Sequence, residues 1–307
     1  MLNMNSQSSS VILAELSKGT LTFIVGPTAS GKTQLALDLA RAENGIIVNG
    51  DSLQVFRQLD IGTAKPSLQE RQLCPHFLFD IVDVGQEFTA GEYRRAALKV
   101  IEDNIEKHNI FIVGGSGFYL RALDKGMFNV EAVPAETVAQ VESWQIEKGN
   151  QFLWDELKAR DADSAKAIHV NDSYRLVRAL SVVLHTGKAW SQMKQDFKDN
   201  EQTLSDRFTV KKIGLQVDRE KLRSRVEQRT QNMLADGLVA EVQGLLKIVR
   251  PDWAPLQSVG YKEVLQFLQG ELAEADLAAT ITQSTMRLAK KQMTWFKKDL
   301  DVEWRPA

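Results

Sequence analysis

A phosphate-binding motif stands near the amino end of the chain. Residues 26–33 read GPTASGKT and fit G-x-x-x-x-G-K-[ST] in full, directly after the apolar run 21–25. The glycines let backbone N–H groups turn toward an anion, and the amino end of a following helix adds partial positive charge. Lys32 supplies a point charge and Thr33 a hydroxyl for Mg²⁺. The motif predicts a bound diphosphate but does not say which molecule carries it.

A nucleotide kinase or hydrolase usually places an acid at the end of a neighbouring strand, beside its metal. The apolar run 110–113 leads instead into the Gly-Gly-Ser segment 114–116. Asp80 and Asp83, near another apolar run, either supply that acid or are solvated loop carboxylates. The missing acid after residue 113 argues against ATP as the ligand.

Asp51 follows the apolar run 45–50, so we expect it at the carboxyl edge of a sheet, where open α/β folds bind ligands. Two interpretations stay open. Asp51 either caps a helix that begins at Ser52, or faces the reacting group and accepts a proton.

Arg229 interrupts the apolar face of a predicted helix over 218–236. Leu222, Val226 and Met233 share that face at helical spacing with Arg229. Burying an unpaired guanidinium is costly, so an anion must lie opposite it. That anion is either an acidic side chain or a bound diphosphate. We favour the diphosphate, because Arg matches phosphate oxygens bidentately.

Apolar runs alternate with helical patterns through the first 120 or so residues, which favours an α/β fold: a central parallel sheet covered by helices on both faces, in three layers. Thr89 and Glu92 form a capping box that opens a helix to about His108. The predicted strands are 21–26, 45–50, 76–82, 109–115 and 211–217.

Tryptophans, charges and helical periodicity replace the strand signals in the middle of the chain. We therefore expect an all-helical insertion at 124–205, within a core formed by 20–123 and 206–307. In the insertion, Asn171 or Asp172 is the expected cap of a helix that stops at Gly187. The helices predicted after residue 217 are 218–236, 238–249, 258–269 and 275–298.

The composition is that of a globular protein without strong charge bias. The 307 residues are 43% hydrophobic and 25% charged, with formal net charge −2, so any nucleic-acid surface must come from local clustering. The single Cys74 excludes an internal disulfide and suits a reducing compartment. No run reaches the roughly 18 apolar residues of a membrane span. We expect a cytoplasmic monomer, with no zinc site and a flexible tail over 1–19.

Positive charge is concentrated on two predicted helices. The helix over 275–298 carries Arg287, Lys290, Lys291, Lys297 and Lys298 on one side. On the insertion, Arg175 and Arg178 stand one turn apart. Basic faces on two elements around an anion pocket predict a polyanionic substrate contacted through its phosphates.

The most specific stretches of the chain are GPTASGKT (26–33), DSLQVFRQLDIGTAKP (51–66), VGGSGFY (113–119), NDSYRLVRAL (171–180), VEQRTQNMLADGLVAEV (226–242), VGYKE (259–263) and RLAKKQMTWFKK (287–298). Together they resemble the tRNA dimethylallyltransferases, which prenylate the adenosine next to the anticodon. The resemblance runs from about residue 20 to residue 298. It extends far beyond the phosphate loop, so a generic relation to phosphate-binding proteins does not explain it.

The resemblance implies that the loop holds dimethylallyl diphosphate, with Mg²⁺, rather than a nucleotide. Asp51 would hydrogen-bond the adenine N6 and take its proton, while Lys32, Ser116 and Arg229 would be the other catalytic residues. The donor would be gripped by Gly26, Pro27, Thr28, Ala29, Ser30, Gly31, Lys32 and Thr33.

The resemblance also implies a tRNA anticodon stem–loop as substrate, held by the helical insertion. The target base must leave its stack to reach the site. The RNA-contacting residues would be Asp51, Ser52, Leu53, Gln54, Ser116, Tyr174, Arg175, Leu176, Val177, Arg178, Gln257, Ser258, Val259, Gly260, Tyr261, Lys262, Arg287, Lys290, Lys291 and Gln292.

The chemistry suits these residue types. The exocyclic amine of adenine is a weak nucleophile, whereas an allylic diphosphate ionises once its leaving charge is neutralised. Lys32, Arg229, Mg²⁺ and the loop amides supply that neutralisation. Asp51 then only has to orient N6 and accept a proton.

The sequence departs from the family at several positions. Ser116 stands where Thr is usual and keeps the hydroxyl, and Lys262 stands where Arg is frequent. Gly117 and Phe118 replace the usual residues before Tyr119, which changes the nearby pocket. No Cys/His module follows the last helix, so the chain resembles the short bacterial form.

Two other functions remain as alternatives. An adenylate isopentenyltransferase would use the same donor with free AMP, ADP or ATP as acceptor. The insertion and the basic helix argue against it, because a small acceptor needs neither. A P-loop nucleotide kinase is disfavoured by the missing strand-end acid.

Overall fold

The computed structural model describes residues 19–127, 133–200 and 203–307. Within these ranges no helix is both long enough and apolar enough to cross a membrane. The tail expected over 1–19 lies outside the described residues, apart from its last position.

The chain divides into two compact units. One contains the chain up to Asp124 together with Leu204–Ala307, and the other is Lys125–Thr203. The second unit covers nearly the same residues as the insertion expected at 124–205. All the elements that carry the phosphate loop and Asp51 belong to the first unit.

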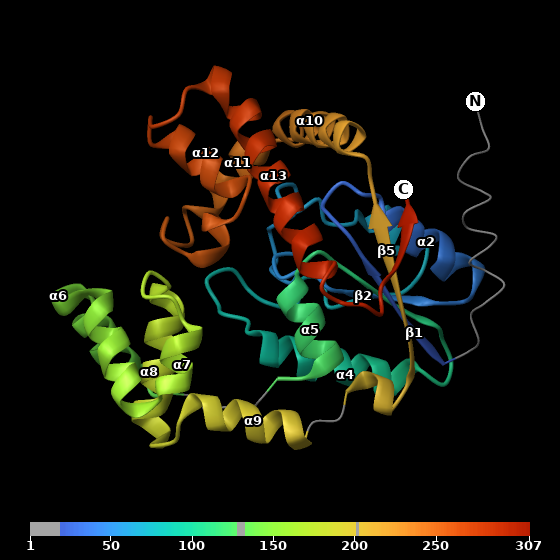
Figure 1. Cartoon of the computed structure of the whole chain (residues 1–307). Helices are drawn as coiled ribbons and strands as arrows, with labels where there is room; N and C mark the ends of the chain where they lie inside the picture. Colours follow the sequence, from blue (N-terminus) through green and yellow to red (C-terminus); the bar gives the residue numbers. More distant parts are fainter. Residues whose placement is uncertain (1–18, 128–132, 201–202) are drawn as a thin grey trace. The chain divides into compact units, whose positions relative to one another are not determined.

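The first unit is built on a six-stranded sheet with parallel pairing and the order β3-β2-β4-β1-β5-β6 (Figure 1). Strands β1, β2 and β4 are buried along their whole length, which is why they are unbroken apolar runs in the sequence. Because the strands are parallel, their carboxyl ends meet at one edge. The strands are β1 (Thr20–Val25), β2 (Ile46–Asn49), β3 (His76–Phe77), β4 (Ile110–Val113), β5 (Thr209–Gln216) and β6 (Glu303–Pro306).

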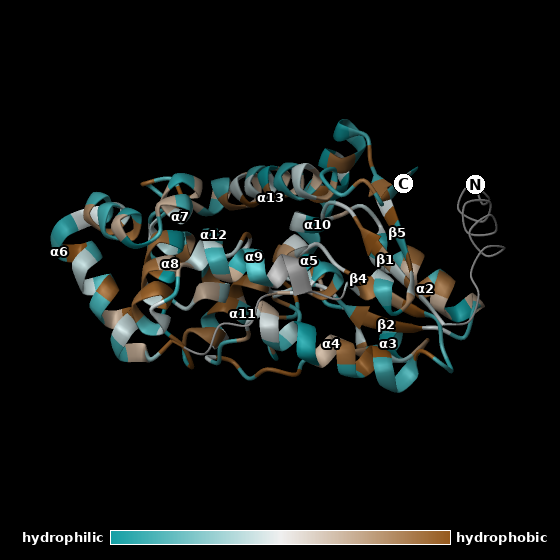
Figure 2. Cartoon of the chain, turned by 60° about the horizontal axis from the view of Figure 1, so that its bottom comes forward, coloured by the Kyte–Doolittle hydropathy of each residue, from teal (hydrophilic) through white to brown (hydrophobic). Residues whose placement is uncertain are grey.

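Helices lie on both sides of the sheet, as predicted for an α/β fold. Helix α2 (Lys32–Ala42) packs its buried side on residues from four strands, while α4 (Ala90–Asn104) and α5 (Gly117–Lys125) lie on the opposite side (Figure 1). The central strands are among the most hydrophobic parts of the chain (Figure 2). The capping box is confirmed: the hydroxyl of Thr89 accepts the N–H of Glu92, whose carboxylate accepts the N–H of Thr89.

Two strands differ from the prediction. The run 76–82 forms only the two-residue β3, because Leu78 (φ 64°) and Asp80 (φ 54°) adopt left-handed backbone conformations that end the ladder. The edge strand β6 was not predicted, because its residues EWRP contain no apolar run. Its proline is tolerated at the edge of a sheet, where no neighbour needs a donor.

Residues 217–307, all of them described, contain four α-helices: α10 (Arg219–Ala235), α11 (Leu238–Leu245), α12 (Tyr261–Leu268) and α13 (Glu274–Phe296). The ranges predicted for α11 and α12, 238–249 and 258–269, were too long. Leu222 and Val226 of α10 pack on Ala289 of α13, and Ala29 of the phosphate loop joins the same cluster. Shorter helical turns are α3 (Leu68–Arg71), η1 (Leu204–Asp206) and η2 (Ala254–Gln257).

The described part of the second unit is helical and has its own apolar core, which includes Leu153, Leu176 and Leu180. Asp172 caps α8 by accepting the N–H of Arg175, and Gly187 ends that helix with φ 66°. The helices of this unit are α6 (Ala135–Arg160), α7 (Ala162–Ala167), α8 (Ser173–Thr186) and α9 (Trp190–Asn200).

Candidate active site at the carboxyl edge of the sheet

The phosphate loop joins β1 to α2. Gly26 has φ 148°, and a Cβ there would lie 2.8 Å from the carbonyl oxygen of Leu215, so only glycine fits. Ser30 is buried, and its hydroxyl has no partner within the described part of the chain. The Lys32 ammonium donates to the carbonyl oxygens of Gly26 (3.0 Å) and Pro27 (2.7 Å). A free buried hydroxyl and an ammonium on backbone carbonyls leave hydrogen-bonding capacity for an anion.

Three charged groups act on one another across this edge. Burial and the nearby Arg229 lower the pKa of Lys32 to about 7, and the Asp51 carboxylate opposes this shift. Burial also lowers the pKa of Arg229, again opposed by Asp51. Two cations in a poorly solvated site are stabilised when an anion lies between them. The electrostatics therefore fit a bound diphosphate.

Arg229 points from α10 toward the loop that follows β2. Its Nη2 donates to the carbonyl oxygen of Thr63 at 3.4 Å. Among the residues that the structure describes, no carboxylate forms an ion pair with this guanidinium. The acidic side-chain partner considered from the sequence is therefore not observed, and a bound anion stays the interpretation for Arg229.

The loop that carries Thr63 is held in place by Glu241 of α11. The Glu241 carboxylate accepts the three backbone N–H groups of residues 60–62 at 2.7 to 3.1 Å. It also accepts the hydroxyl of Tyr261 at 2.7 Å. A Cβ on Gly62 would overlap the Tyr261 ring, at 2.5 Å from Cζ. The loop is thus packed closely enough to give the Thr63 carbonyl a defined position.

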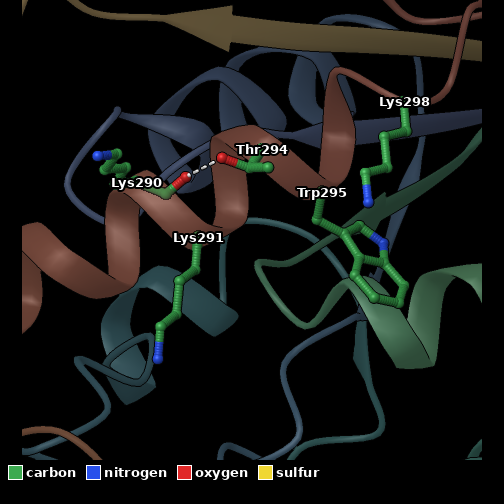
Figure 3. A pocket seen from close by; sticks show the side chains of 5 residues that line it. All are labelled: Lys290, Lys291, Thr294, Trp295 and Lys298. Atoms are coloured by element: carbon green, nitrogen blue, oxygen red, sulfur yellow. Dashed lines mark hydrogen bonds between the residues drawn. The ribbon is translucent and has the colours of Figure 1, made fainter. Parts of the chain in front are cut away.

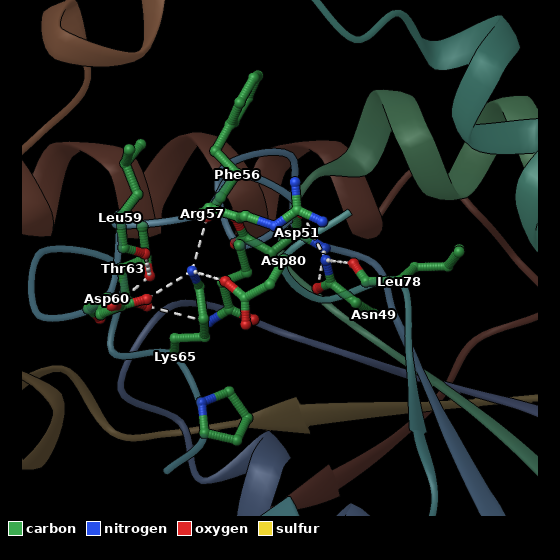
Figure 4. Close-up of polar contacts among 12 residues, drawn as sticks. Asn49, Asp51, Phe56, Arg57, Leu59, Asp60, Thr63, Lys65, Leu78 and Asp80 are labelled. Atoms are coloured by element: carbon green, nitrogen blue, oxygen red, sulfur yellow. Dashed lines mark hydrogen bonds and ion pairs between the residues drawn. The ribbon is translucent and has the colours of Figure 1, made fainter. Parts of the chain in front are cut away.

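Asp80 is engaged in ion pairs, so neither interpretation offered from the sequence describes it (Figure 4). Its two carboxylate oxygens accept Lys65 at 2.6 Å and Arg71 at 2.7 Å. Burial raises the pKa of this carboxyl, but the hydrogen bonds from Lys65 and Arg71 outweigh it and the net shift is downward. Asp83 pairs with Arg57. Both acids are thus paired with basic side chains of the segment 57–71.

Asp51 lies two residues after the end of β2. Residues 52–59 form turns rather than a helix, so the helix-capping alternative is wrong. One carboxylate oxygen accepts the backbone N–H of Leu53 at 2.9 Å. The buried Asn49 fixes the backbone beside it: its Oδ1 accepts the Asp51 N–H at 2.8 Å, and its Nδ2 donates to the carbonyl oxygens of Asp51 and Leu78, both at 3.0 Å. Asp51 is therefore held in one orientation at the sheet edge (Figure 4).

Ser116 connects the end of β4 to the turn after β2. Its Oγ accepts the backbone N–H of Ser52 at 2.9 Å and donates to the Ser52 hydroxyl at 3.1 Å. The two strand ends are unusually close, because a Cβ on Gly114 would lie 2.0 Å from the carbonyl oxygen of Gly50. Only a glycine at position 114 permits this approach.

The basic side of α13 borders a pocket of about 240 Å³ lined by Lys290, Lys291, Thr294, Trp295 and Lys298 (Figure 3). Three ammonium groups beside an indole ring are typical of a surface that contacts phosphates and bases. Trp295 also packs against Gly117, where a Cβ would lie 2.3 Å from the ring. The basic surface of α13 thus borders the segment that contains Ser116.

Comparison with known proteins assigns this arrangement to a family. A family model described as IPP transferase matches residues 54–299. The chain belongs to the IPP transferase family. Among curated relatives, it is 43% identical to a tRNA dimethylallyltransferase of Bdellovibrio bacteriovorus, over 94% of each chain. It is 40% identical to that of Geobacter metallireducens, over 95% of this chain and 94% of the relative.

Solved structures agree. The full-length tRNA isopentenylpyrophosphate transferase of Bacillus halodurans is 32% identical, with a TM-score of 0.67 over 94% of this chain and 90% of that one. A eukaryotic dimethylallyltransferase described as acting on tRNA is 27% identical, with a TM-score of 0.80 over 94% of this chain and 74% of that one. The family shares the α/β fold with a phosphate loop that the sequence predicts.

The RNA-contacting positions expected for an IPP transferase fall into exposed and buried groups. Leu176 and Tyr261 are 0% exposed and Gly260 is also buried, so the side chains of Leu176 and Tyr261 pack in the interior. The partly or fully exposed residues of the expected set are Asp51, Ser52, Leu53, Gln54, Ser116, Tyr174, Arg175, Val177, Arg178, Gln257, Ser258, Val259, Lys262, Arg287, Lys290, Lys291 and Gln292.

The donor set for Mg²⁺ in this IPP transferase is sparse. Over the described ranges, no group of three or more His, Cys, Asp or Glu side chains could hold a metal ion. Thr33 is exposed in the first turn of α2 and presents a hydroxyl. Mg²⁺ binds readily through few protein ligands when substrate phosphates and waters complete its shell. The residues fit a metal that arrives with a diphosphate.

Several residues that build the site were not found from the sequence. The side chains of Asn49 and Glu241 hydrogen-bond backbone groups, and Thr63 contributes its own carbonyl oxygen. A residue that contacts backbone, or contributes it, has no characteristic motif. The available signal was the pattern of buried polar residues, such as Asn49 directly after an apolar run. Buried polar groups need hydrogen-bond partners, so a polar residue directly after a buried apolar run indicates a side chain that holds nearby backbone in place.

Proposed function

We propose that this chain transfers the dimethylallyl group of dimethylallyl diphosphate to the N6 amine of the adenosine immediately 3′ of the anticodon in tRNA, releasing diphosphate. The observation that carries the proposal is the convergence of an anion cradle and a carboxylate at one sheet edge. Lys32 and Arg229 provide the cationic side, and Asp51 stands close enough to influence the pKa of both. Transfer of a prenyl group needs cations to stabilise the diphosphate leaving group and a carboxylate to orient the amine and accept its proton.

The leaving group is stabilised by the phosphate loop. As the bond between the allylic carbon and the bridging oxygen breaks, negative charge develops on the diphosphate. The loop amides, Lys32 and Arg229 are fixed before this happens, so they stabilise the charge without reorganising. When the donor binds, before the bond breaks, the Lys32 ammonium turns from the Gly26 and Pro27 carbonyl oxygens to the diphosphate, whose negative charge keeps it protonated. The Thr33 hydroxyl would help to hold Mg²⁺, which would supply further charge neutralisation.

The acceptor amine is oriented by Asp51. The N6 lone pair attacks the allylic carbon, a nitrogen–carbon bond forms, and one N6 proton leaves to the free oxygen of Asp51 or to the departing diphosphate. Leu53 occupies the first oxygen of Asp51 through its N–H, so the second remains for N6. Ser116 holds the neighbouring Ser52 backbone and keeps this geometry in place.

The acceptor is an RNA rather than a free nucleotide. Support comes from the basic side of α13 and from the second unit, where Tyr174 is 81% exposed and stands beside the exposed Arg175 and Arg178. An exposed aromatic ring among arginines is suited to base stacking and phosphate contact. We propose that the second unit grips the anticodon stem–loop and that the protein acts as a monomer.

A transfer assay tests this function. The protein, Mg²⁺ and radiolabelled dimethylallyl diphosphate are incubated with an anticodon stem–loop that carries adenosine 3′ of the anticodon, and with a matched stem–loop carrying inosine there. We expect label only on the adenosine RNA, because inosine lacks the N6 amine. Transfer to AMP in preference to the stem–loop would make the protein an adenylate isopentenyltransferase. ATP hydrolysis without label on RNA would overturn the proposal.

A further inference from the structure

Gln292 of α13 does not face solvent with the basic side chains beside it. Its Oε1 accepts the backbone N–H of Thr28 at 2.9 Å, and its Nε2 donates to the carbonyl oxygen of Gly115 at 3.1 Å. The amide orientation is unambiguous, because the Thr28 N–H can only donate and the Gly115 carbonyl can only accept. One side chain thus connects the phosphate loop to the strand end that carries Ser116.

The packing around Gln292 leaves little freedom. A Cβ on Gly115 would lie 2.4 Å from Nε2, so the side chain lies directly against the backbone. On the same helix, Trp295 lies against Gly117. Close contacts one turn apart fix the position of α13 along the 115–117 segment. A shift of the helix would be transmitted to both partners of the Gln292 amide.

The partner in the phosphate loop is one of its own amides. In loops of this type, backbone N–H groups turn toward the phosphates. The N–H of Thr28 is instead bound to Gln292, so its direction is set by α13. Ala29, the next residue, packs in the cluster with Met286 of α13 and Val226 of α10. The shape of the phosphate loop therefore depends on where α13 lies.

The same helix carries the basic surface. Lys290 and Lys291 directly precede Gln292, and Arg287 lies on the preceding turn. Phosphates bound to these side chains would hold α13 in one position. A fixed α13 would, through Gln292, fix the positions of the Thr28 amide and the Gly115 carbonyl. Donor binding would then cost less conformational entropy in the phosphate loop.

We propose that Gln292 is a positioning residue that couples RNA binding on α13 to donor affinity in the phosphate loop. This inference rests on the proposed function, and it replaces the direct RNA contact expected of Gln292 from the sequence. Coupling between two sites is reciprocal, so each ligand should strengthen the binding of the other. The apolar cluster around Ala29 is the competing route for such coupling.

The test compares Gln292→Met with Gln283→Met. Methionine keeps the unbranched shape of glutamine without its hydrogen bonds, and Gln283 is an exposed residue of the same helix. The affinity of a fluorescent anticodon stem–loop is measured with and without Mg²⁺ and dimethylallyl S-thiolodiphosphate, a poorly ionising analogue of the donor. Melting temperatures confirm that both variants fold.

We expect the analogue to tighten RNA binding about fivefold or more in the unmodified protein and in Gln283→Met, a typical size for coupled sites. In Gln292→Met the factor should fall to within about twofold of unity, while RNA affinity without analogue is unchanged. Because the coupling is reciprocal, the donor KM at saturating RNA and the RNA KM at saturating donor should both rise by the lost factor.

Three results would overturn the inference. Coupling that persists in Gln292→Met would assign it to the apolar cluster. Weaker RNA binding by this variant without analogue, with the coupling factor preserved, would make Gln292 an RNA contact. Transfer by the unmodified protein without any coupling would show that the two sites are independent. A protein that transfers no label contradicts the proposed function itself, so the two failures are distinguishable.

Discussion

The hydroxyl of Ser116, at the end of β4, accepts the backbone N–H of Ser52, in the turn after β2, at 2.9 Å. This contact ties two strand ends together one residue away from Asp51. In the proposed reaction Asp51 directs a single oxygen toward the acceptor, so the hydrogen bond between these two serines, which follow different strands, should affect the transfer rate.

Replacing Ser116 by alanine should lower the transfer rate without weakening donor binding. The Ser52 N–H would lose its acceptor, at a cost of about 1–2 kcal/mol or roughly tenfold in rate if the cost falls on the reactive geometry. Ser116→Thr keeps the hydroxyl and should retain nearly full activity. Single-turnover transfer and donor affinity measure the two effects. Equal activity of the alanine and threonine variants would make the contact irrelevant to catalysis.

Substitution of Asp51 separates orientation from proton transfer. Asp51→Asn can still accept the Leu53 N–H through its amide oxygen but cannot take a proton. We expect both Asp51→Asn and Asp51→Ala to lose about a hundredfold or more in transfer rate, with donor binding intact. Labelled transfer to the stem–loop measures this. If Asp51→Asn stayed active while Asp51→Ala did not, Asp51 would only orient N6, and the diphosphate would take the proton.

Donor binding should depend on pH through Lys32. Its pKa is lowered to about 7 in the empty site, so below that pH the ammonium is already present to meet the diphosphate. Above it, binding must first return a proton to Lys32, so affinity falls as pH rises and each binding event takes up a proton. Calorimetry with inorganic diphosphate and Mg²⁺, in buffers of different ionisation enthalpy, measures this uptake.

Lys32→Arg provides the matched control for that pH dependence. Arginine stays charged over the whole pH range. The diphosphate affinity of Lys32→Arg should therefore fall less steeply with rising pH than that of the unmodified protein. The titration of diphosphate itself is common to both proteins and cancels in the comparison. Identical slopes for the two proteins would contradict a lowered pKa at Lys32.

Asn49 should contribute to stability more than its sequence position indicates. Asn49→Ala leaves the Asp51 N–H and the Leu78 carbonyl without their buried partner, at a cost of about 1–3 kcal/mol in the free energy of unfolding. Asn232→Ala removes an exposed hydrogen bond with Gln228 and should change stability by less than about 0.5 kcal/mol. Denaturant unfolding of both variants measures the difference. Equal effects would mean that Asn49 is not an anchor.

Much of the fold was accessible from the sequence because its signals are local. The phosphate loop between β1 and α2, the capping box at Thr89 and the stop at Gly187 each depend on a few neighbouring residues. The strand β3 was predicted too long because the apolar character of 76–82 gives no sign of the left-handed backbone at Leu78 and Asp80. The edge strand β6 has no periodicity of its own and forms only because β5 offers a free edge.

The sequence by itself determined that a phosphate loop, a carboxylate after a strand and an arginine on the apolar face of a helix belong to one α/β protein. Residue type and short-range spacing encode these features. Tertiary structure alone decided what each group contacts. The Gln292 amide meets a backbone N–H 264 residues away, and the Glu241 carboxylate meets three backbone N–H groups about 180 residues away. Such partners are backbone groups that every residue carries, so only the packing of helices against the sheet selects which of them meet.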